Sequence, residues 1–212
     1  MGYVSVLVFH YTTKRRIMGE EQKMATNMAI RAAVDGIHEI VGDNGAKILF
    51  RNIGFSHIYE NPPGYTWEPC ITVPEQAKIY GEVINLVGLN GGIGIWRRIG
   101  YTNIKYAVEI GHVLDAFMDL PPAEKYLRGM EIFCAASGKG KPVLREDGLA
   151  DFDCPDCLLC AGYKTDRVMC GVYEGTTQFM IDFAFGKGKY QVRETMCKAK
   201  GDETCYFTLI QK

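Results

Sequence analysis

Hydrophobic and polar positions along the chain repeat with helical spacing in some stretches and with strand-like character in others. Apolar residues recur every three or four positions, as on one face of a helix, over residues 20–41, 73–87, 96–117, 123–136 and 167–185. Runs of β-branched and aromatic residues predict strands at 3–11 and 46–53, an extended segment at 144–152 and a hairpin of 190–199 with 203–210. Because the helices come in runs, without strand–helix–strand alternation, the pattern predicts an α+β fold with an antiparallel sheet packed against several helices.

Glycine, proline and capping residues set the boundaries of these elements. Turns or loops are predicted at 42–45 and 61–64, and a glycine-rich hinge at 88–94. Thr72 is a suitable N-cap for the helix at 73–87, which tolerates Pro74 in its first turn. We interpret residues 1–212 as a single domain with a lead-in (1–23), a helical part with a ligand pocket (24–143) and a cysteine-rich part (144–212).

Composition narrows the class of protein. The 212 residues carry 24 basic and 25 acidic side chains, so no basic field indicates nucleic-acid binding. The apolar runs are shorter than the roughly 20 residues that span a bilayer. The opening residues do not resemble a signal peptide. We therefore expect a cytoplasmic protein with no membrane span.

Eight cysteines are many for such a protein, and six of them lie between positions 154 and 205. In a reducing compartment, a cluster of this kind favours metal ligands over disulfides. The predicted hairpin places Cys197 opposite Cys205, with Cβ atoms about 4.5–5.5 Å apart. Two thiolates at that distance can bind one zinc ion.

Two further ligands complete a predicted Cys₃Glu zinc site. Glu194 precedes Cys197 by three residues, so a β-bulge between them is needed to bring both to one face of the strand. Cys170 lies near the N-terminus of the preceding helix, where the thiolate form is stabilised. With four protein ligands, zinc at Cys170, Glu194, Cys197 and Cys205 would be structural.

Other interpretations of the cysteines remain open. Two facing cysteines on a hairpin also fit a cross-strand disulfide, or small buried side chains. The triplet Cys154, Cys157 and Cys160 fits an iron–sulfur loop with Cys134 or Cys170 as a fourth ligand, and it fits a second zinc loop equally well.

The order of motifs in the tail resembles the V4R (4-vinyl reductase) domain. The motifs are CGVYEG at 170–175, FG at 185–186, ETMC at 194–197 and GDETCYF at 201–207, with a glycine-rich entry to a long helix at 91–101. The resemblance covers about residues 24–210 and implies that Cys170, Glu194, Cys197 and Cys205 bind zinc. It also implies a fold shared with TRAPP-type trafficking subunits and, more remotely, with haem-based nitric oxide sensors.

The resemblance implies a module that binds a small hydrophobic molecule, either an aromatic effector or a tetrapyrrole, as a sensor or carrier. Candidate ligand-binding residues lie on the long helix predicted at 96–117: Trp96, Tyr106, His112 and Phe117. One alternative is a tetrapyrrole vinyl reductase with an iron–sulfur cluster as electron donor, because no dinucleotide motif is present. Another is a TRAPP-like homodimer that serves assembly. Binding is favoured over catalysis, but the sequence leaves the question open.

Overall fold

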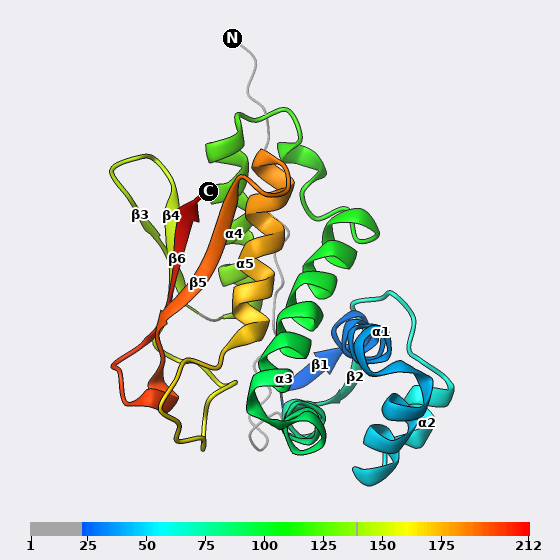
Figure 1. Cartoon of the computed structure of the whole chain (residues 1–212). Helices are drawn as coiled ribbons and strands as arrows, with labels where there is room; N and C mark the ends of the chain where they lie inside the picture. The colour runs from blue at the N-terminus through cyan, green and yellow to red at the C-terminus, as the bar shows by residue number, and fades with distance from the viewer. Residues whose placement is uncertain (1–22, 139) are drawn as a thin grey trace, which may run out of the picture.

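The computed structural model of the protein describes residues 23–138 and 140–212 (Figure 1). The predicted strand at 3–11 lies outside these residues. The helices are α1 (Asn27–Asn52), α2 (Ser56–Glu60), α3 (Val73–Glu109), α4 (Pro122–Ser137) and α5 (Gly171–Phe185), with short 3₁₀ turns η1 (Asp115–Phe117) and η2 (Lys198–Lys200). The strands are β1 (Met24–Thr26), β2 (Pro69–Thr72), β3 (Lys141–Leu144), β4 (Ala150–Cys154), β5 (Tyr190–Met196) and β6 (Cys205–Gln211).

Two antiparallel sheets are present in the described part of the chain. β1 pairs with β2, and a four-stranded sheet has the order β3-β4-β6-β5. Helix α5 packs between this sheet and α3, and α1 and α2 lie on the far side of α3 (Figure 1). The predicted α+β class with an antiparallel sheet is confirmed.

The β5–β6 hairpin has the predicted irregularity, but its strands are shorter than predicted, because Lys198–Lys200 forms η2 and β6 begins only at Cys205. Met196 lies opposite Tyr206, while Glu194 lies opposite Phe207, so the register shifts by one residue between Glu194 and Met196. The first pair is in the predicted register, but Cys197 lies beyond the end of β5 and is not paired with Cys205 in the ladder. The bulge turns Glu194 to the face from which it reaches Cys170.

The predicted strand at 46–53 is wrong, because α1 continues through it to Asn52. Ala46, Leu49 and Phe50 are fully buried, and their spacing of three and four residues lies on one face of a helix. Gly42 adopts a left-handed φ of 70°, so the helix kinks there and then continues.

Helix α3 begins where predicted, at a capping box in which Thr72 and Glu75 satisfy each other's backbone N–H groups. The predicted hinge at 88–94 reduces to Gly88, whose φ of 74° kinks an otherwise continuous helix. The helix ends at Glu109 and not near residue 117, since residues 110–114 form turns before η1.

The other predicted elements are shifted at their ends. The helix predicted at 123–136 is confirmed as α4, and the helix predicted from 167 begins only at Gly171. The extended segment predicted at 144–152 is two strands, β3 and β4, joined by a turn.

Helices α3 and α5 approach each other unusually closely through glycine. A Cβ atom added to Gly100 would overlap the carbonyl oxygen of Val172, and one added to Gly175 would overlap the carbonyl oxygen of Arg97. Because side chains are absent at both positions, the two backbones are in direct contact. This contact fixes the position of the α5 N-terminus, where Cys170 is the capping residue.

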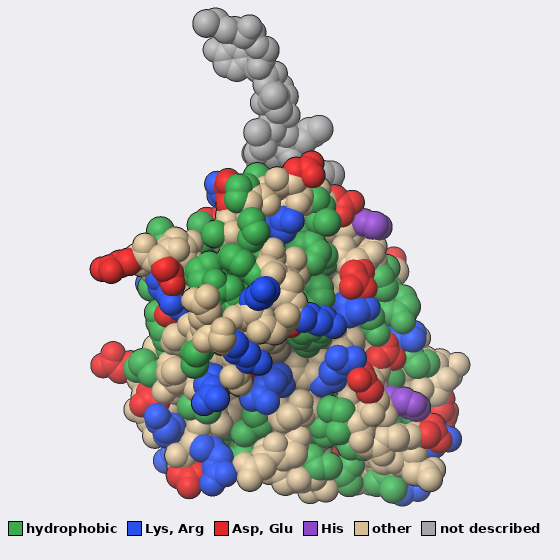
Figure 2. All heavy atoms as spheres, turned by 45° about the horizontal axis from the view of Figure 1, so that its top comes forward, with side chains coloured by type: hydrophobic (Ala, Val, Ile, Leu, Met, Phe, Trp, Pro, Cys, Tyr) green, Lys and Arg blue, Asp and Glu red, His purple; other side chains and the backbone are tan. Residues whose placement is uncertain are grey.

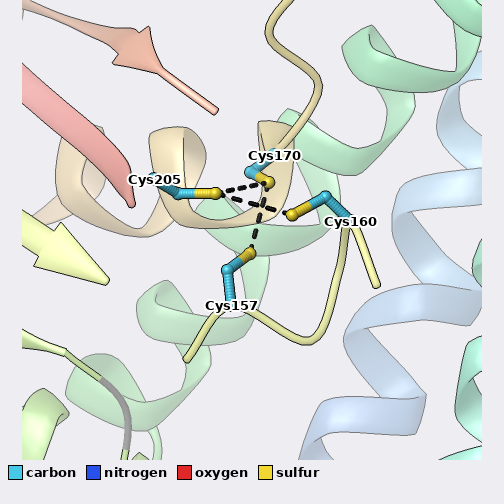
Figure 3. Close-up of side chains that lie close together, drawn as sticks. All are labelled: Cys157, Cys160, Cys170 and Cys205. Carbon is cyan, nitrogen blue, oxygen red and sulfur yellow. Dashed lines mark hydrogen bonds between the residues drawn. The ribbon is translucent and has the colours of Figure 1, made fainter. Parts of the chain in front are cut away.

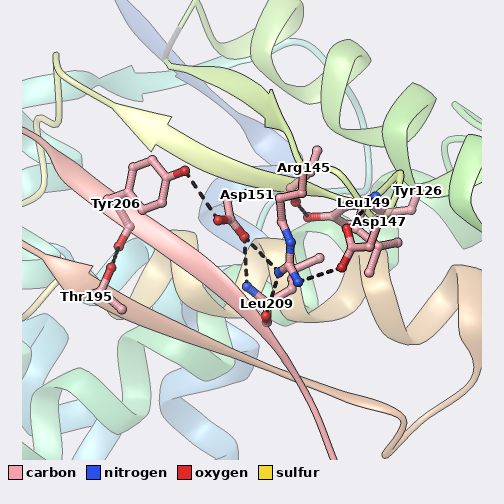
Figure 4. A network of polar contacts seen from close by, with 9 residues as sticks. Tyr126, Arg145, Asp147, Leu149, Asp151, Thr195, Tyr206 and Leu209 are labelled. Atoms are coloured by element: carbon pink, nitrogen blue, oxygen red, sulfur yellow. Dashed lines mark hydrogen bonds and ion pairs between the residues drawn. The ribbon is translucent and has the colours of Figure 1, made fainter.

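A network of polar contacts connects the β3–β4 turn and β4 to β6 (Figure 4). Arg145 donates to the carbonyl oxygen of Leu209 at 2.7 Å and to Asp147 at 2.6 Å. The buried carboxylate of Asp151 accepts from the Leu209 N–H at 3.1 Å and from the Tyr206 hydroxyl at 3.3 Å. The network thereby joins the β3–β4 turn to β6.

Replacing Asp151 with alanine is expected to lower the free energy of unfolding by about 1–3 kcal/mol, because the buried N–H of Leu209 loses its acceptor. Urea denaturation measures the change. Asp166→Ala is the control, since that side chain is 80% exposed and its loss should cost well under about 1 kcal/mol. Equal effects of the two substitutions would contradict a structural role for the network.

The surface is mixed in charge. Figure 2 shows Lys and Arg side chains interspersed with acidic and apolar ones on one face. Among the described residues, no helix is both long enough and apolar enough to cross a membrane.

Candidate thiolate centre

Five cysteines and one glutamate meet beneath the N-terminus of α5. Cys157 and Cys160 lie in the loop after β4, and Cys170 is the residue that precedes α5. Cys197 directly follows β5, and Cys205 begins β6. All five are at most 5% exposed. Figure 3 shows four of these thiols pointing toward a common centre.

The distances between sulfur atoms suit metal coordination. The Sγ atom of Cys170 lies 3.3 Å from that of Cys157, 3.6 Å from that of Cys205 and 3.9 Å from that of Cys197. The Sγ atoms of Cys160 and Cys205 are 3.5 Å apart. Four thiolates around one ion, with metal–sulfur bonds of about 2.3 Å, have sulfur atoms about 3.8 Å apart.

The ligand atoms form two overlapping quartets. One consists of Cys157, Cys160, Cys170 and Cys205, and the other of Cys170, Glu194, Cys197 and Cys205; within each, all ligand atoms lie within 4.8 Å of one another. Cys170 and Cys205 belong to both quartets.

Glu194 is a carboxylate with one unsatisfied oxygen. Its Oε2 atom accepts a hydrogen bond from the Cys170 backbone N–H at 2.6 Å, whereas its buried Oε1 atom has no hydrogen-bond partner. Burial, together with the nearby Cys197 thiol, raises the pKa of this carboxyl to about 9. A cation bound at Oε1 would reverse this cost of burial, since an opposite charge favours the ionised form.

Hydrogen bonds between the thiols shift their pKa values in opposite directions. The hydrogen bond to Cys157 lowers the pKa of Cys160 and raises that of Cys170. The backbone N–H of Lys198 also points at the Cys205 sulfur, 3.4 Å away. The Lys198 ammonium bonds to the Pro155 carbonyl oxygen at 2.6 Å, which ties the cysteine loop to the hairpin turn.

The structure therefore brings together all four residues predicted as ligands: Cys170, Glu194, Cys197 and Cys205. Only two members of the second predicted group, the cysteine triplet, take part in the centre. Cys157 and Cys160 join Cys170 and Cys205, while Cys154 belongs to neither quartet and lies in β4 opposite Cys205. The sequence predicted the triplet as a second group, with Cys134 or Cys170 as its fourth ligand, because spacing alone cannot show that the loop also reaches Cys205.

The residues predicted to bind an organic ligand do not gather at one place. Trp96 is fully buried and donates to the Tyr80 carbonyl oxygen at 3.2 Å. The Tyr106 hydroxyl donates to Asp35 at 2.6 Å. The His112 side chain is 67% exposed and pairs with Asp115. Phe117 is partly buried in η1.

Two open hollows lie between α1 and α2, far from the thiolate centre in the fold. Their volumes are about 500 and 400 Å³, and they share Lys47, Tyr59 and Glu60 in their walls. Asp35, the partner of Tyr106, lines the smaller hollow. Tyr106 therefore contacts a residue in the wall of the smaller hollow.

Comparison with known proteins identifies the fold. No protein-family pattern and no curated protein sequence matches the chain. Among solved structures, an H-NOX protein from S. oneidensis in the Fe(II)NO ligation state superposes with a TM-score of 0.60 at 12% identity, over 89% of this chain and 99% of that one. A structure from a study of haem distortion in the H-NOX family gives 0.58 at 13% identity, over 87% and 93%. An oxygen-binding H-NOX domain related to soluble guanylate cyclases gives 0.53 at 15% identity, also over 87% and 93%.

The chain thus has the fold of H-NOX proteins, and its assignment to the V4R family and to a TRAPP-like fold is wrong. The vinyl reductase alternative rested on the V4R family and is therefore not supported either. The V4R assignment rested on the order of Cys, Glu and Gly residues in the tail. These residues specify a local hairpin and a thiolate arrangement, but they do not specify the connectivity of the helices.

The prediction of zinc, with an iron–sulfur cluster as a further possibility, is wrong for this fold as well. The solved structures that share it are described by their ligation to haem iron and by haem distortion. The spacing of cysteines could not predict this similarity, because spacing identifies local groups of ligands and does not identify the fold.

Haem does not fit the residues that the structure describes. Haem iron needs an axial ligand, such as His or a Cys thiolate. The described histidines His38, His57 and His112 are all exposed, and His10 lies outside the described residues. Cys134 is buried, but burial raises the pKa of its thiol to about 11 and keeps it protonated. The other buried cysteines of the described residues lie in or beside the thiolate centre.

Proposed function

We propose that this protein is a small-molecule sensor or carrier module whose buried thiolate centre binds a soft metal ion. The observation that carries the proposal is the convergence of five buried cysteines and Glu194 within coordination distance. Buried ionisable groups at this density are stable when they are paired or bound to metal. Thiolate ligands select soft transition-metal ions, and elemental analysis identifies which ion is bound.

The centre joins three parts of the chain. Cys157 and Cys160 come from the loop after β4, Cys170 from the start of α5, and Cys197 and Cys205 from the hairpin. A bound ion would hold these segments together, so that its binding energy adds to the stability of the fold. A change in the ion would then alter the position of α5 relative to the sheet.

Protein purified without oxygen is expected to contain bound metal in molar proportion to the chain, measured by elemental mass spectrometry. Cys170→Ser should lose most of the metal, because Cys170 belongs to both quartets. Cys70→Ser is the matched control, since Cys70 lies in β2, away from the centre, and should leave the metal content unchanged. A wild-type protein that contains no metal and takes up none from solution would refute the proposal.

The ligand that we propose is a small apolar molecule. The H-NOX fold supports this choice, because two of the similar structures are described by complexes with nitric oxide and oxygen. A tetrapyrrole is disfavoured by the lack of a buried axial ligand among the described residues. Mass spectrometry of a solvent extract of the purified protein tests the proposal, and protein that carries no small molecule and binds no aromatic probe dye would count against it.

A homodimer, a cytoplasmic location and the absence of nucleic-acid binding remain proposals. The described cysteines are all free thiols, which suits a reducing compartment. The near-zero net charge offers little attraction to phosphate backbones. Sedimentation analysis at several concentrations tests the dimer.

A further inference from the structure

We infer that the thiolate centre is a binuclear site, in which Cys170 and Cys205 each bridge two divalent metal ions. The first ion would be bound by Cys157, Cys160, Cys170 and Cys205, and the second by Cys170, Glu194, Cys197 and Cys205. This inference rests on the proposed metal-binding function and extends it to the number of ions and the ligands of each.

The shared pair has the geometry of a bridge. The Sγ atoms of Cys170 and Cys205 are 3.6 Å apart, close to the edge of about 3.8 Å expected for a tetrahedral thiolate site. Two tetrahedra can share that edge, because a thiolate sulfur has lone pairs enough to bind two ions. The remaining ligands come from different segments, with Cys157 and Cys160 from the loop after β4 and Glu194 and Cys197 from the end of β5.

A single ion would leave buried groups without partners. If the ion occupied the first quartet, the Glu194 Oε1 atom would remain buried with no hydrogen-bond partner, in a residue that is only 7% exposed. If it occupied the second quartet, Cys157 and Cys160 would stay as buried thiols 3.3–3.5 Å from metal-bound sulfur atoms. Two ions give every one of these ligand atoms a partner.

The charge balance also favours two ions. Five thiolates and one carboxylate carry six negative charges, and their burial is costly unless cations compensate it. One divalent ion would leave four of these charges uncompensated, whereas two ions would leave two. Hydrogen bonds from the backbone N–H groups of Cys170 to Glu194 and of Lys198 to Cys205 stabilise the remainder.

The test is a titration of the reduced, metal-stripped full chain with Co²⁺, in the absence of oxygen. Native mass spectrometry should show two cobalt ions per folded chain, and the absorbance from thiolate-to-cobalt charge transfer should rise until two equivalents are bound. The electron paramagnetic resonance signal of Co²⁺ should rise over the first equivalent and fall over the second, because ions bridged by thiolates couple magnetically.

Variants assign the ions to the two quartets. Cys157→Ser with Cys160→Ser should reduce the capacity from two ions to one, as should Glu194→Gln with Cys197→Ser, and in both the resonance signal should no longer fall. Cys70→Ser with Cys134→Ser is the matched control and should keep two ions. If a variant fails to fold, as judged by circular dichroism, the wild-type titration decides alone.

The outcomes separate this inference from the proposed function. One cobalt ion per wild-type chain would overturn the binuclear site and leave metal binding intact. Two ions without magnetic coupling would overturn the bridging role of Cys170 and Cys205. No bound cobalt at all would overturn both the inference and the proposed metal-binding function.

Discussion

Gly175→Ala is expected to destabilise the protein by about 3 kcal/mol or more, at or beyond the upper end of ordinary overpacking. The added methyl group would overlap the carbonyl oxygen of Arg97 in α3. Backbone atoms inside a helix cannot rotate away as a side chain can, so α3 and α5 must separate. Because α5 carries Cys170 at its N-terminus, metal affinity should fall together with stability.

Gly94→Ala is the matched control for this substitution. Gly94 lies in α3, the helix that Gly175 contacts, and an added Cβ would have no neighbouring atom within 4 Å. Alanine favours a helix over glycine by about 1 kcal/mol, so this variant should be as stable as the wild type or slightly more stable. Urea denaturation and Co²⁺ titration of both variants make the comparison. A Gly175→Ala protein with wild-type stability would refute the direct contact of the two helices.

Trp96→Ala is expected to lower the free energy of unfolding by about 3–5 kcal/mol, the range for truncating a large buried aromatic side chain. Trp96 is fully buried, and its indole N–H donates to the Tyr80 carbonyl oxygen. Its ring packs edge-on against those of Tyr80 and Tyr163, with centroids 5.7 and 6.4 Å away. The truncation removes these contacts and leaves a cavity between α3 and the cysteine loop.

The chain contains one other tryptophan, which serves as the control. Trp67 is 53% exposed, so Trp67→Ala should change the free energy of unfolding by about 0.5 kcal/mol or less. In a Trp67→Phe protein, the fluorescence comes from Trp96 alone and should be blue-shifted, as for an indole shielded from water. If Trp96→Ala were as stable as the wild type, Trp96 would not be a core residue, and its predicted role in binding an organic ligand would gain support.

Features that depend on neighbours in sequence could be predicted from the sequence. The capping box at Thr72 and Glu75 requires only a spacing of three residues. The bulge after Glu194 was predicted from the requirement that Glu194 and Cys197 share a face, whereas the tight turn predicted at residues 200–202 is a longer connection that contains η2. The four residues predicted as metal ligands, Cys170, Glu194, Cys197 and Cys205, lie together in the fold, and their role in metal binding stays a prediction.

Features that depend on contacts between distant segments could not be predicted in this way. The stretch at 46–53 has strand-like residue types, yet it packs as a helix because Ala46, Leu49 and Phe50 are buried on one face against the rest of the fold. The resemblance to V4R domains rested on local motifs, and the path of the helices shows an H-NOX fold in its place.

The sequence by itself determined the class of fold, the hairpin and the chemical character of the thiolate centre, since each depends on residue type and short-range spacing. Only the tertiary structure decided that Cys157 and Cys160 reach Cys170 and Cys205, and that the Glu194 Oε1 atom is buried without a partner. The physical reason is that the loop after β4 is positioned by the packing of α5 against α3, through glycines whose role becomes visible only when both helices are in place.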